Sequence, residues 1–381
     1  MPLDLNEALS GLKPSGIRRF AALARETEGC ISLTLGEPGE DTPQDICAEV
    51  ARALADGETH YPPNAGTEAL RDAIASHLSG RGLSFGADEV IVTSGATEAL
   101  FSAMEALLNP GDEVIVPMPA FLLYQSLVTL NRGSVVELDT APHGYQIAPD
   151  ALGEVVGERT KAIVLTSPNN PTGCVLSAES LDAVAELAAE RDFYVICDDV
   201  YDQLVYVDGY EGFAQRHPEL RDRTIVVNSF SKPYAMTGWR LGWLAAPAEL
   251  VEQVAKVHQY AVSSAVSFTQ RAAVRALASD VVPMRERYRA RRDLVTQALA
   301  ATGLPTPEPG GAFYAFPSIE EFGMSSEEFC TRAIREAGVA MVPGALFGGE
   351  GHVRLSYACA DAELEEALVR LGRFVGALRR G

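Results

Sequence analysis

The chain of 381 residues carries 31 lysines and arginines against 52 aspartates and glutamates, a formal net charge of −21 at neutral pH. This charge disfavours nucleic acid as a partner, because nucleic-acid phosphates attract basic proteins. Hydrophobic residues make up 47% and charged residues 22% of the chain, which is ordinary for a globular protein and argues against disorder. With no signal-peptide pattern and no run of about 18 apolar residues, we expect a cytoplasmic protein without a membrane partner.

Short runs rich in valine and isoleucine, separated by helical or turn-rich segments, recur from about residue 85 to residue 247. There are seven of them, at residues 90–95, 113–119, 134–139, 162–168, 194–199, 224–229 and 241–247. Such runs are typical of strands buried on both faces, and helical spacers are typical of parallel crossover connections. The pattern predicts an α/β fold whose large domain has a seven-stranded, mostly parallel sheet flanked by helices.

The C-terminal part of the chain has a different pattern and predicts a smaller α+β unit. An arginine-rich helix is expected over 283–301, with its arginines on a solvated face. The segments expected after it are a Pro/Gly-rich stretch at 305–317, short strands at 339–342 and 353–357, and a closing helix at 361–378. We expect a large domain over 45–282 and a small domain built from 1–44 and 283–381.

The six cysteines and six histidines are scattered along the chain. No CxxC pair and no HExxH motif occurs, so we expect reduced, mostly buried thiols and no protein-bound metal.

Four lysines occur, and one of them stands out. Lys13, Lys161 and Lys256 have the sequence surroundings of surface charges. Lys232 directly follows the apolar run 224–230, at a predicted strand end where open α/β sheets bind ligands. Apolar surroundings lower the pKa of a lysine, as a Schiff-base lysine requires. The alternative interpretation of Lys232 is a strand-end lysine that reaches solvent. Residues 229–232 also match the S-x-x-K motif of penicillin-recognising serine hydrolases, but the companion motifs S-D-N and K-T-G are absent, which makes that interpretation weak.

Other polar residues also follow predicted strands. Residues 94–97 (SGAT) follow a strand and open a helix, which suits a phosphate site or a plain turn. Asp198 follows an apolar strand and needs a cation or donors, whereas Arg354 lies within an apolar alternation and needs an anion. Asn170 lies between two prolines, and Arg240 lies between two tryptophans. This set suits a phosphorylated aldehyde cofactor and a carboxylated amine substrate.

Eight segments, in order and over nearly the full length, resemble the class I/II aminotransferases, the fold-type I enzymes that depend on pyridoxal 5′-phosphate (PLP). The segments are LGEPGEDTP, HYPPNAGTEALRDAIA, SGATEAL, SPNNPTG, CDDVYDQLVY, NSFSKPYAMTGWRLGW, GGAFYAFP and HVRLSYA. One departure is Gly39 followed by Glu40, where many relatives have Asp-Phe in a loop near the substrate entrance. Several further segments resemble the branch of aromatic and N-acetyl-LL-2,6-diaminopimelate aminotransferases.

The resemblance implies a role for each matching position. Lys232 would form the Schiff base and move the substrate Cα proton, Asp198 would keep the pyridine nitrogen protonated, and Tyr201 would hydrogen-bond the phenolic oxygen. The residues implied in cofactor binding are Gly95, Ala96, Thr97, Phe121, Asn170, Asp198, Tyr201, Ser229, Lys232, Arg240 and, from the other subunit of a homodimer, Tyr61. Those implied in substrate binding are Gly36, Asn170 and Arg354, the last as a clamp on the α-carboxylate.

The expected activity is therefore transamination between an L-amino acid and a 2-oxo acid, with an aromatic amino acid, aspartate or N-acetyl-diaminopimelate as donor. A carbon–sulfur β-lyase on the same fold is an alternative, although the run 237–240 (TGWR) resembles transaminases more closely. A noncatalytic PLP-sensing regulator is more remote, because those carry an amino-terminal helix-turn-helix domain and the match here begins within about 20 residues of Met1.

Overall fold

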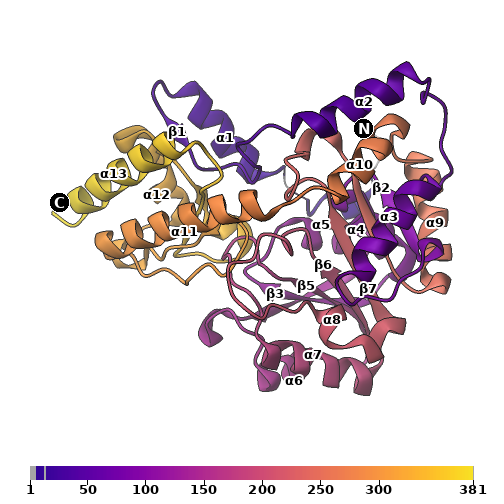
Figure 1. The fold of residues 1–381 in the computed structure, drawn as a ribbon. Coiled ribbons are helices and arrows are strands. Elements are labelled where there is room, and N and C mark those ends of the chain that lie inside the picture. Colours follow the sequence, from indigo (N-terminus) through magenta and orange to yellow (C-terminus); the bar gives the residue numbers. More distant parts are fainter. Residues whose placement is uncertain (1–5, 13, 381) are drawn as a thin grey trace, which may run out of the picture.

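The computed structural model describes residues 6–12 and 14–380, and a seven-stranded sheet lies at its centre (Figure 1). The strand order is β2-β8-β7-β6-β5-β3-β4; β8 runs antiparallel to both of its neighbours, and all other neighbours are parallel. The strands are β2 (Val90–Thr93), β3 (Glu113–Met118), β4 (Ser134–Asp139), β5 (Thr160–Thr166), β6 (Tyr194–Asp198), β7 (Thr224–Ser229) and β8 (Gly242–Ala245). All seven predicted strands are confirmed, as is the mostly parallel sheet.

Helices cover both faces of this sheet. Successive side chains of a strand point to opposite faces, so Val195 and Cys197 pack with α7 whereas Ile196 packs on the side of α4. The helices are α2 (Gln44–Ala55), α3 (Glu68–Ser79), α4 (Ala96–Leu107), α5 (Leu123–Leu130), α6 (Pro149–Val155), α7 (Ala178–Arg191), α8 (Phe213–Arg216), α9 (Ala248–Val262) and α10 (Ser267–Leu277). Burial of every strand residue of β2 and β7 explains their apolar sequence.

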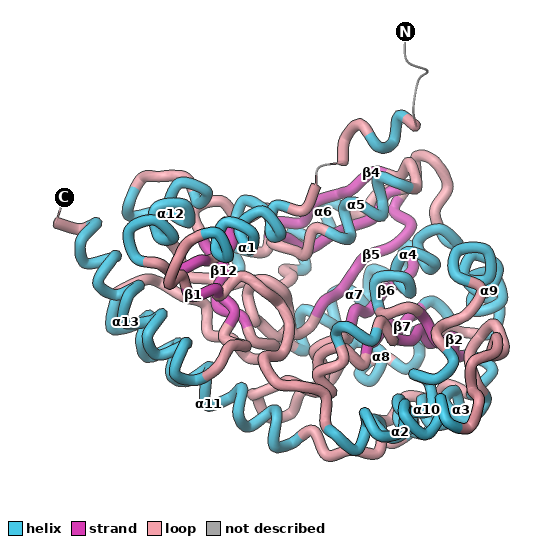
Figure 2. The backbone as a smooth tube through the Cα atoms, turned by 90° about the horizontal axis from the view of Figure 1, so that it is seen from above, coloured by secondary structure: helices cyan, strands magenta, loops and turns pink. Residues whose placement is uncertain are grey.

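Elements from both ends of the chain lie together, and this group is called the smaller body here. Figures 1 and 2 both show α1 (Gly16–Glu26) close to α12 (Ser326–Arg332). The strand β1 (Ile31–Ser32) pairs in parallel with β10 (Val339–Ala340). The remaining elements are α11 (Val282–Thr302), α13 (Asp361–Leu378), β9 (Tyr314–Ala315), β11 (Val342–Pro343) and β12 (Val353–Ser356), with β11, β12 and β9 forming one antiparallel sheet. The body is α+β, as predicted.

Two details differ from the sequence-based expectations. The strand expected over 339–342 is two strands, because the chain leaves the partner of β1 and joins a different sheet after Ala340. The prediction that the arginines of α11 are solvated is wrong for Arg291 and Arg292, whose side chains are 9% and 13% exposed. Arg291 pairs with the carboxylates of Glu40 and Asp361, and Arg292 donates to the carbonyl oxygen of Pro309. No helix within the described residues is long and apolar enough to cross a membrane.

Candidate active site

A cavity of about 330 Å³ lies where the carboxyl ends of β5, β6 and β7 approach the first turn of α4 and the smaller body. Its volume falls in the range typical of small-molecule sites. The predicted site residues that line it are Gly36, Ala96, Thr97, Phe121, Asn170, Asp198, Tyr201, Ser229, Lys232, Arg240 and Arg354. Gly95 adjoins this group through Arg240, whereas Tyr61 lies outside the cavity and is 92% exposed. The structure therefore brings together all of the predicted site residues except Tyr61.

Lys232 follows β7, and its Nζ donates a hydrogen bond to the carbonyl oxygen of Gly36. Burial lowers the pKa of Lys232 to about 8, partly offset by the charge of Glu37 and assisted by that of Arg354. The amine of Lys232 is thus partly unprotonated near neutral pH, which a nucleophile or a general base requires. Lys256 forms a surface ion pair with Glu252 at 3.7 Å, as expected of a surface charge, and Lys13 lies outside the described residues.

Asp198 ends β6 and is 5% exposed. The hydroxyl of Tyr124 donates to Asp198 Oδ2 at 2.6 Å and lies 2.7 Å from the hydroxyl of Thr166. Burial raises the pKa of Asp198 to about 6, against the opposing effects of the Tyr124 hydrogen bond and the charge of Lys232. Asp198 Oδ1 has no hydrogen-bond partner among the described residues. A buried carboxylate oxygen without a donor is costly, so this atom is suited to a donor from a ligand.

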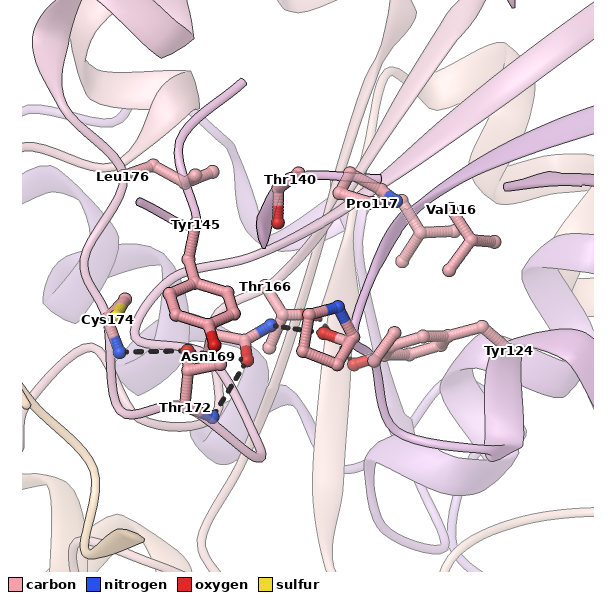
Figure 3. A pocket seen from close by; sticks show the side chains of 13 residues that line it. Val116, Pro117, Tyr124, Thr140, Tyr145, Thr166, Asn169, Thr172, Cys174 and Leu176 are labelled. Carbon is pink, nitrogen blue, oxygen red and sulfur yellow. Dashed lines mark hydrogen bonds between the residues drawn. The ribbon is translucent and has the colours of Figure 1, made fainter. Parts of the chain in front are cut away.

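A second, much smaller cavity lies behind the Tyr124–Thr166 pair (Figure 3). Figure 3 shows Tyr124 at one side and the ring of Tyr145 with the thiol of Cys174 at the other. Its volume of about 20 Å³ is enough for the centre of one water molecule. Tyr124 thus separates this small cavity from the larger one that contains Asp198.

The first turn of α4 faces the guanidinium of Arg240. Gly95 precedes the helix with a φ of +81°, and a Cβ at this position would lie 2.7 Å from Arg240 Nη2. Arg240 is held by a hydrogen bond from its Nη1 to the carbonyl oxygen of Thr237 at 3.0 Å. Ser229 Oγ accepts from the backbone N–H of Ser231 at 2.9 Å and lines the same cavity. A helix N-terminus beside an arginine and a hydroxyl is suited to a phosphate dianion.

Arg354, on β12, is 1% exposed. Its Nη1 donates to Asn170 Oδ1 at 2.9 Å and its Nη2 to the carbonyl oxygen of Thr34 at 2.5 Å. Its guanidinium lies 4.6 Å from the ring centroid of Tyr314 and 4.9 Å from that of Phe347. Burial lowers the pKa of Arg354, and within the described residues its Nε has no partner. A buried guanidinium held by neutral acceptors is suited to bind a carboxylate from outside the chain.

Tyr201 and Phe121 also line the cavity. The hydroxyl of Tyr201 lies 2.7 Å from the hydroxyl of Tyr314, and burial raises the pKa of Tyr201. Phe121 packs edge-on against Tyr124, with ring centroids 6.3 Å apart. Both aromatic rings are therefore held in place before any ligand arrives.

Sequence reasoning missed several residues that shape the site. Tyr124 carried a signal, since it lies shortly after a predicted strand end, and Tyr314 lies inside a segment that was matched without being given a role. His258 carried none: it is fully buried, its Nδ1 lies 3.2 Å from Glu98 Oε1, and its Nε2 lies 2.9 Å from the carbonyl oxygen of Asn64. Glu98 also accepts from the backbone N–H of Ser94 and so supports the first turn of α4.

The fold and this lysine-centred cavity at the carboxyl edge of a wound sheet define an α/β enzyme with a site for an anionic ligand. Residues 28–371 match the family described as aminotransferase class I and II, and the chain belongs to this family. It is an aminotransferase.

Two relatives and one solved structure show how far the similarity extends. The chain is 42% identical to an aspartate aminotransferase of Pyrococcus abyssi and 40% identical to aromatic-amino-acid aminotransferase 2 of Thermococcus litoralis, each over 97% of both chains. The structure of aspartate aminotransferase from Thermus thermophilus with maleate superimposes with a TM-score of 0.92 at 38% identity, covering 98% of this chain and 100% of that one. Family and fold thus agree over residues 28–371.

Proposed function

We propose that this protein transfers the amino group of an L-amino acid to a 2-oxo acid with PLP as its cofactor. Membership of the aminotransferase family supports the reaction class. When bound, PLP supplies an aldehyde that takes up the amino group and a ring that withdraws electrons from the substrate Cα. The observation that carries the proposal is that Lys232 Nζ, the unpaired Asp198 Oδ1 and the guanidinium of Arg354 belong to residues lining one cavity.

The residues around the cavity fit each part of PLP. The unpaired Asp198 Oδ1 suits a protonated ring nitrogen, and the amine of Lys232 suits the aldehyde. Gly95 leaves room beside Arg240 for a phosphate at the first turn of α4, which a Cβ would fill. We assign Tyr201 and Asn170 to the phenolic oxygen and Phe121 to the ring face; Ala96, Thr97 and Ser229 are assigned to the phosphate.

The chain's own side chains account for binding and proton transfer. Arg354 binds the α-carboxylate of the amino acid, and Asn170 holds the guanidinium in orientation through its 2.9 Å hydrogen bond. A substrate fixed at this end presents its Cα–H bond in one direction. Lys232, whose pKa of about 8 leaves part of it unprotonated near neutral pH, takes up the Cα proton as general base.

We further propose a cytoplasmic homodimer in which Tyr61 reaches the cofactor phosphate of the other subunit. The exposure of Tyr61, 92%, and its position outside the cavity of its own chain support this assignment. We also propose that 45–282 form the large domain and that 1–44 with 283–381 form the small one. The parallel pairing of β1 with β10 supports the joining of the two chain ends.

The donor is proposed to be aspartate, an aromatic amino acid or N-acetyl-diaminopimelate. The relatives named for aspartate and for aromatic amino acids support the first two. Ile17, Leu35 and Phe121 line the cavity and give it an apolar wall that suits an aromatic side chain.

The test is the visible absorbance of the purified protein with PLP, followed by single amino acids and an assay for the matching 2-oxo acid. We expect a band that one donor bleaches with release of its 2-oxo acid. Lys232→Ala should lack the band, whereas Lys256→Ala, at the surface, should keep it. A protein that stays colourless with PLP, like its Lys232→Ala variant, would refute the proposal. Release of pyruvate from cystathionine would instead indicate the β-lyase.

A further inference from the structure

Residues 36–43, called the strap here, connect the smaller body to α2 and border the cavity. At the start of the strap, the carbonyl oxygen of Gly36 accepts the hydrogen bond from Lys232, and Gly36 and the preceding Leu35 both line the cavity. Near its end, Thr42 Oγ1 donates to the carbonyl oxygen of Ala235 at 2.6 Å. Thr42 Oγ1 also accepts a hydrogen bond from Trp239 Nε1 at 2.9 Å. Both ends of the strap are therefore tied to the segment 232–239, which begins with Lys232.

The middle of the strap lies against the segment that follows β12. A Cβ at Gly39 would lie 2.4 Å from the backbone oxygen of Ala358. The backbone of the strap thus approaches the segment after β12 more closely than any other residue type at this position allows. Gly39 thus allows the strap to pack directly against Ala358, shortly after the strand β12 that carries Arg354.

Glu40, the next residue, is held by donors from α11. Its Oε2 accepts from the hydroxyl of Tyr288 at 2.7 Å, and its Oε1 lies 3.1 Å from Nη1 of both Arg287 and Arg291. Its side chain is 16% exposed, Arg291 is 9% exposed, and Tyr288 is fully buried. Although burial opposes it, the donors lower the pKa of Glu40. A carboxylate this sheltered, with hydrogen bonds from Tyr288 and Arg287 and the charge of Arg291 beside it, is held much more firmly than an exposed ion pair.

We propose that Glu40 is a positioning residue that sets the affinity for substrate by fastening the strap to α11. The proposal rests on the proposed function. Between the ties at Gly36 and Thr42, Glu40 is the charged group that joins the strap to the long helix of the smaller body. With its charge removed, the strap loses this tie and the wall formed by Leu35 and Gly36 moves. A small displacement of a pocket wall weakens substrate positioning. Asp198 ends β6 and Lys232 follows β7, so the positions of both are set mainly by the central sheet, which Glu40 does not contact.

Glu40→Gln in the holoenzyme tests this, because glutamine keeps the shape and an acceptor for Tyr288 but loses the charge. We expect KM for the amino acid to rise ~5–30-fold with kcat and the cofactor absorbance unchanged. Amide hydrogen exchange of peptides covering the strap should accelerate. Glu286→Gln is the matched control: it lies on α11 and pairs with Arg285 and Arg289, away from the strap, so both readouts should stay at wild-type values.

Arg287→Gln supplies a second variant, since its half-exposed side chain can be replaced without loss of the fold. It should raise KM less than Glu40→Gln, and the double variant should raise it no more than Glu40→Gln alone, because both act through one contact. A Glu40→Gln protein with a lowered melting temperature but unchanged KM and unchanged strap exchange would overturn the inference and leave Glu40 a structural residue. Failure of the proposed function is distinct: the wild type itself would lack the visible band, and strap exchange would still test the tie.

Discussion

Replacing Tyr124 with phenylalanine should raise the pKa of Asp198 and destabilise the cofactor-free protein mainly above neutral pH. The Tyr124 hydroxyl donates to Asp198 Oδ2 at 2.6 Å, beside a carboxylate that is 5% exposed. A hydrogen bond to a charged group contributes ~1.5–3 kcal/mol. Since about 1.4 kcal/mol corresponds to one pKa unit, the pKa of Asp198 should move from about 6 to ~7–8.

The sign of the pH dependence follows from the unfolded chain, where the pKa of an aspartate is ~3.9. Because the folded-state pKa of Asp198 is higher, the unfolded chain loses this proton first as pH rises, and the native state is destabilised. In the wild type this destabilisation develops between ~pH 4 and the folded-state pKa of about 6. In the variant this destabilisation continues to develop up to ~pH 7–8. The part of the free energy of unfolding that depends on the ionisation of Asp198 should therefore differ little between the two proteins at ~pH 5.5, and by ~1.4–2.7 kcal/mol at ~pH 8.5.

Calorimetry of the cofactor-free proteins at the two pH values measures this difference. At ~1.3 °C per kcal/mol for a chain of 381 residues, Tyr124→Phe should lose ~2–3 °C more at the higher pH than at the lower. Tyr206→Phe is the control, because the Tyr206 hydroxyl donates to the uncharged backbone oxygen of Ala312. The decrease in melting temperature of this variant should be the same at both pH values. Equal losses for Tyr124→Phe at the two pH values would refute the view that its hydroxyl stabilises the charged form of Asp198.

Three further substitutions test other parts of the site. Arg354→Lys should raise KM for the amino acid ~10–100-fold in steady-state kinetics, because lysine offers no planar fork for a carboxylate; an unchanged KM would contradict the clamp. Gly95→Ala should weaken PLP binding in a titration of the cofactor-free protein, since φ is +81° and the new Cβ meets Arg240 at 2.7 Å; equal affinity would speak against this cradle. His258→Leu should lower the free energy of unfolding by ~1–3 kcal/mol, because it removes the buried contacts of the imidazole with Glu98 and with the carbonyl oxygen of Asn64; a loss below ~0.5 kcal/mol would contradict a structural role for this contact.

The sequence predicts the central sheet well because its strands are buried on both faces. Burial of this kind forces near-continuous apolar runs, so Val90–Thr93 and Thr224–Ser229 were recognisable without any partner strand. Polar residues that directly follow such runs, Asp198 and Lys232 among them, were recognisable as candidates for the same reason. Their convergence in one cavity follows from the parallel strand order, which brings the carboxyl ends together.

Contacts between residues distant in sequence could not be predicted from the sequence alone. The burial of Arg291 depends on Glu40, some 250 residues earlier, so the arginine-rich helix looked uniformly solvated. The division of 339–342 into two strands depends on which sheet each half joins, and the valines and alanine of that segment suit both. Tyr61 belongs to a matched segment, but the role we propose for it needs a second chain, which its neighbours in sequence do not reveal.

Because β8 runs antiparallel to β7, the residues proposed to bind the cofactor and the residue proposed to bind the substrate lie on different parts of the fold. The chain leaves the sheet after Ser229 and returns at Gly242 on the same edge, so a single loop carries both Lys232 and Arg240. The separation of the lysine amine from the guanidinium of Arg240, which we propose to bind the phosphate, thus depends on one local connection. Arg354, in contrast, arrives on a strand of a different sheet. A change in how the two sheets are placed relative to each other can therefore alter the substrate site that we propose around Arg354 without altering the loop that carries Lys232 and Arg240.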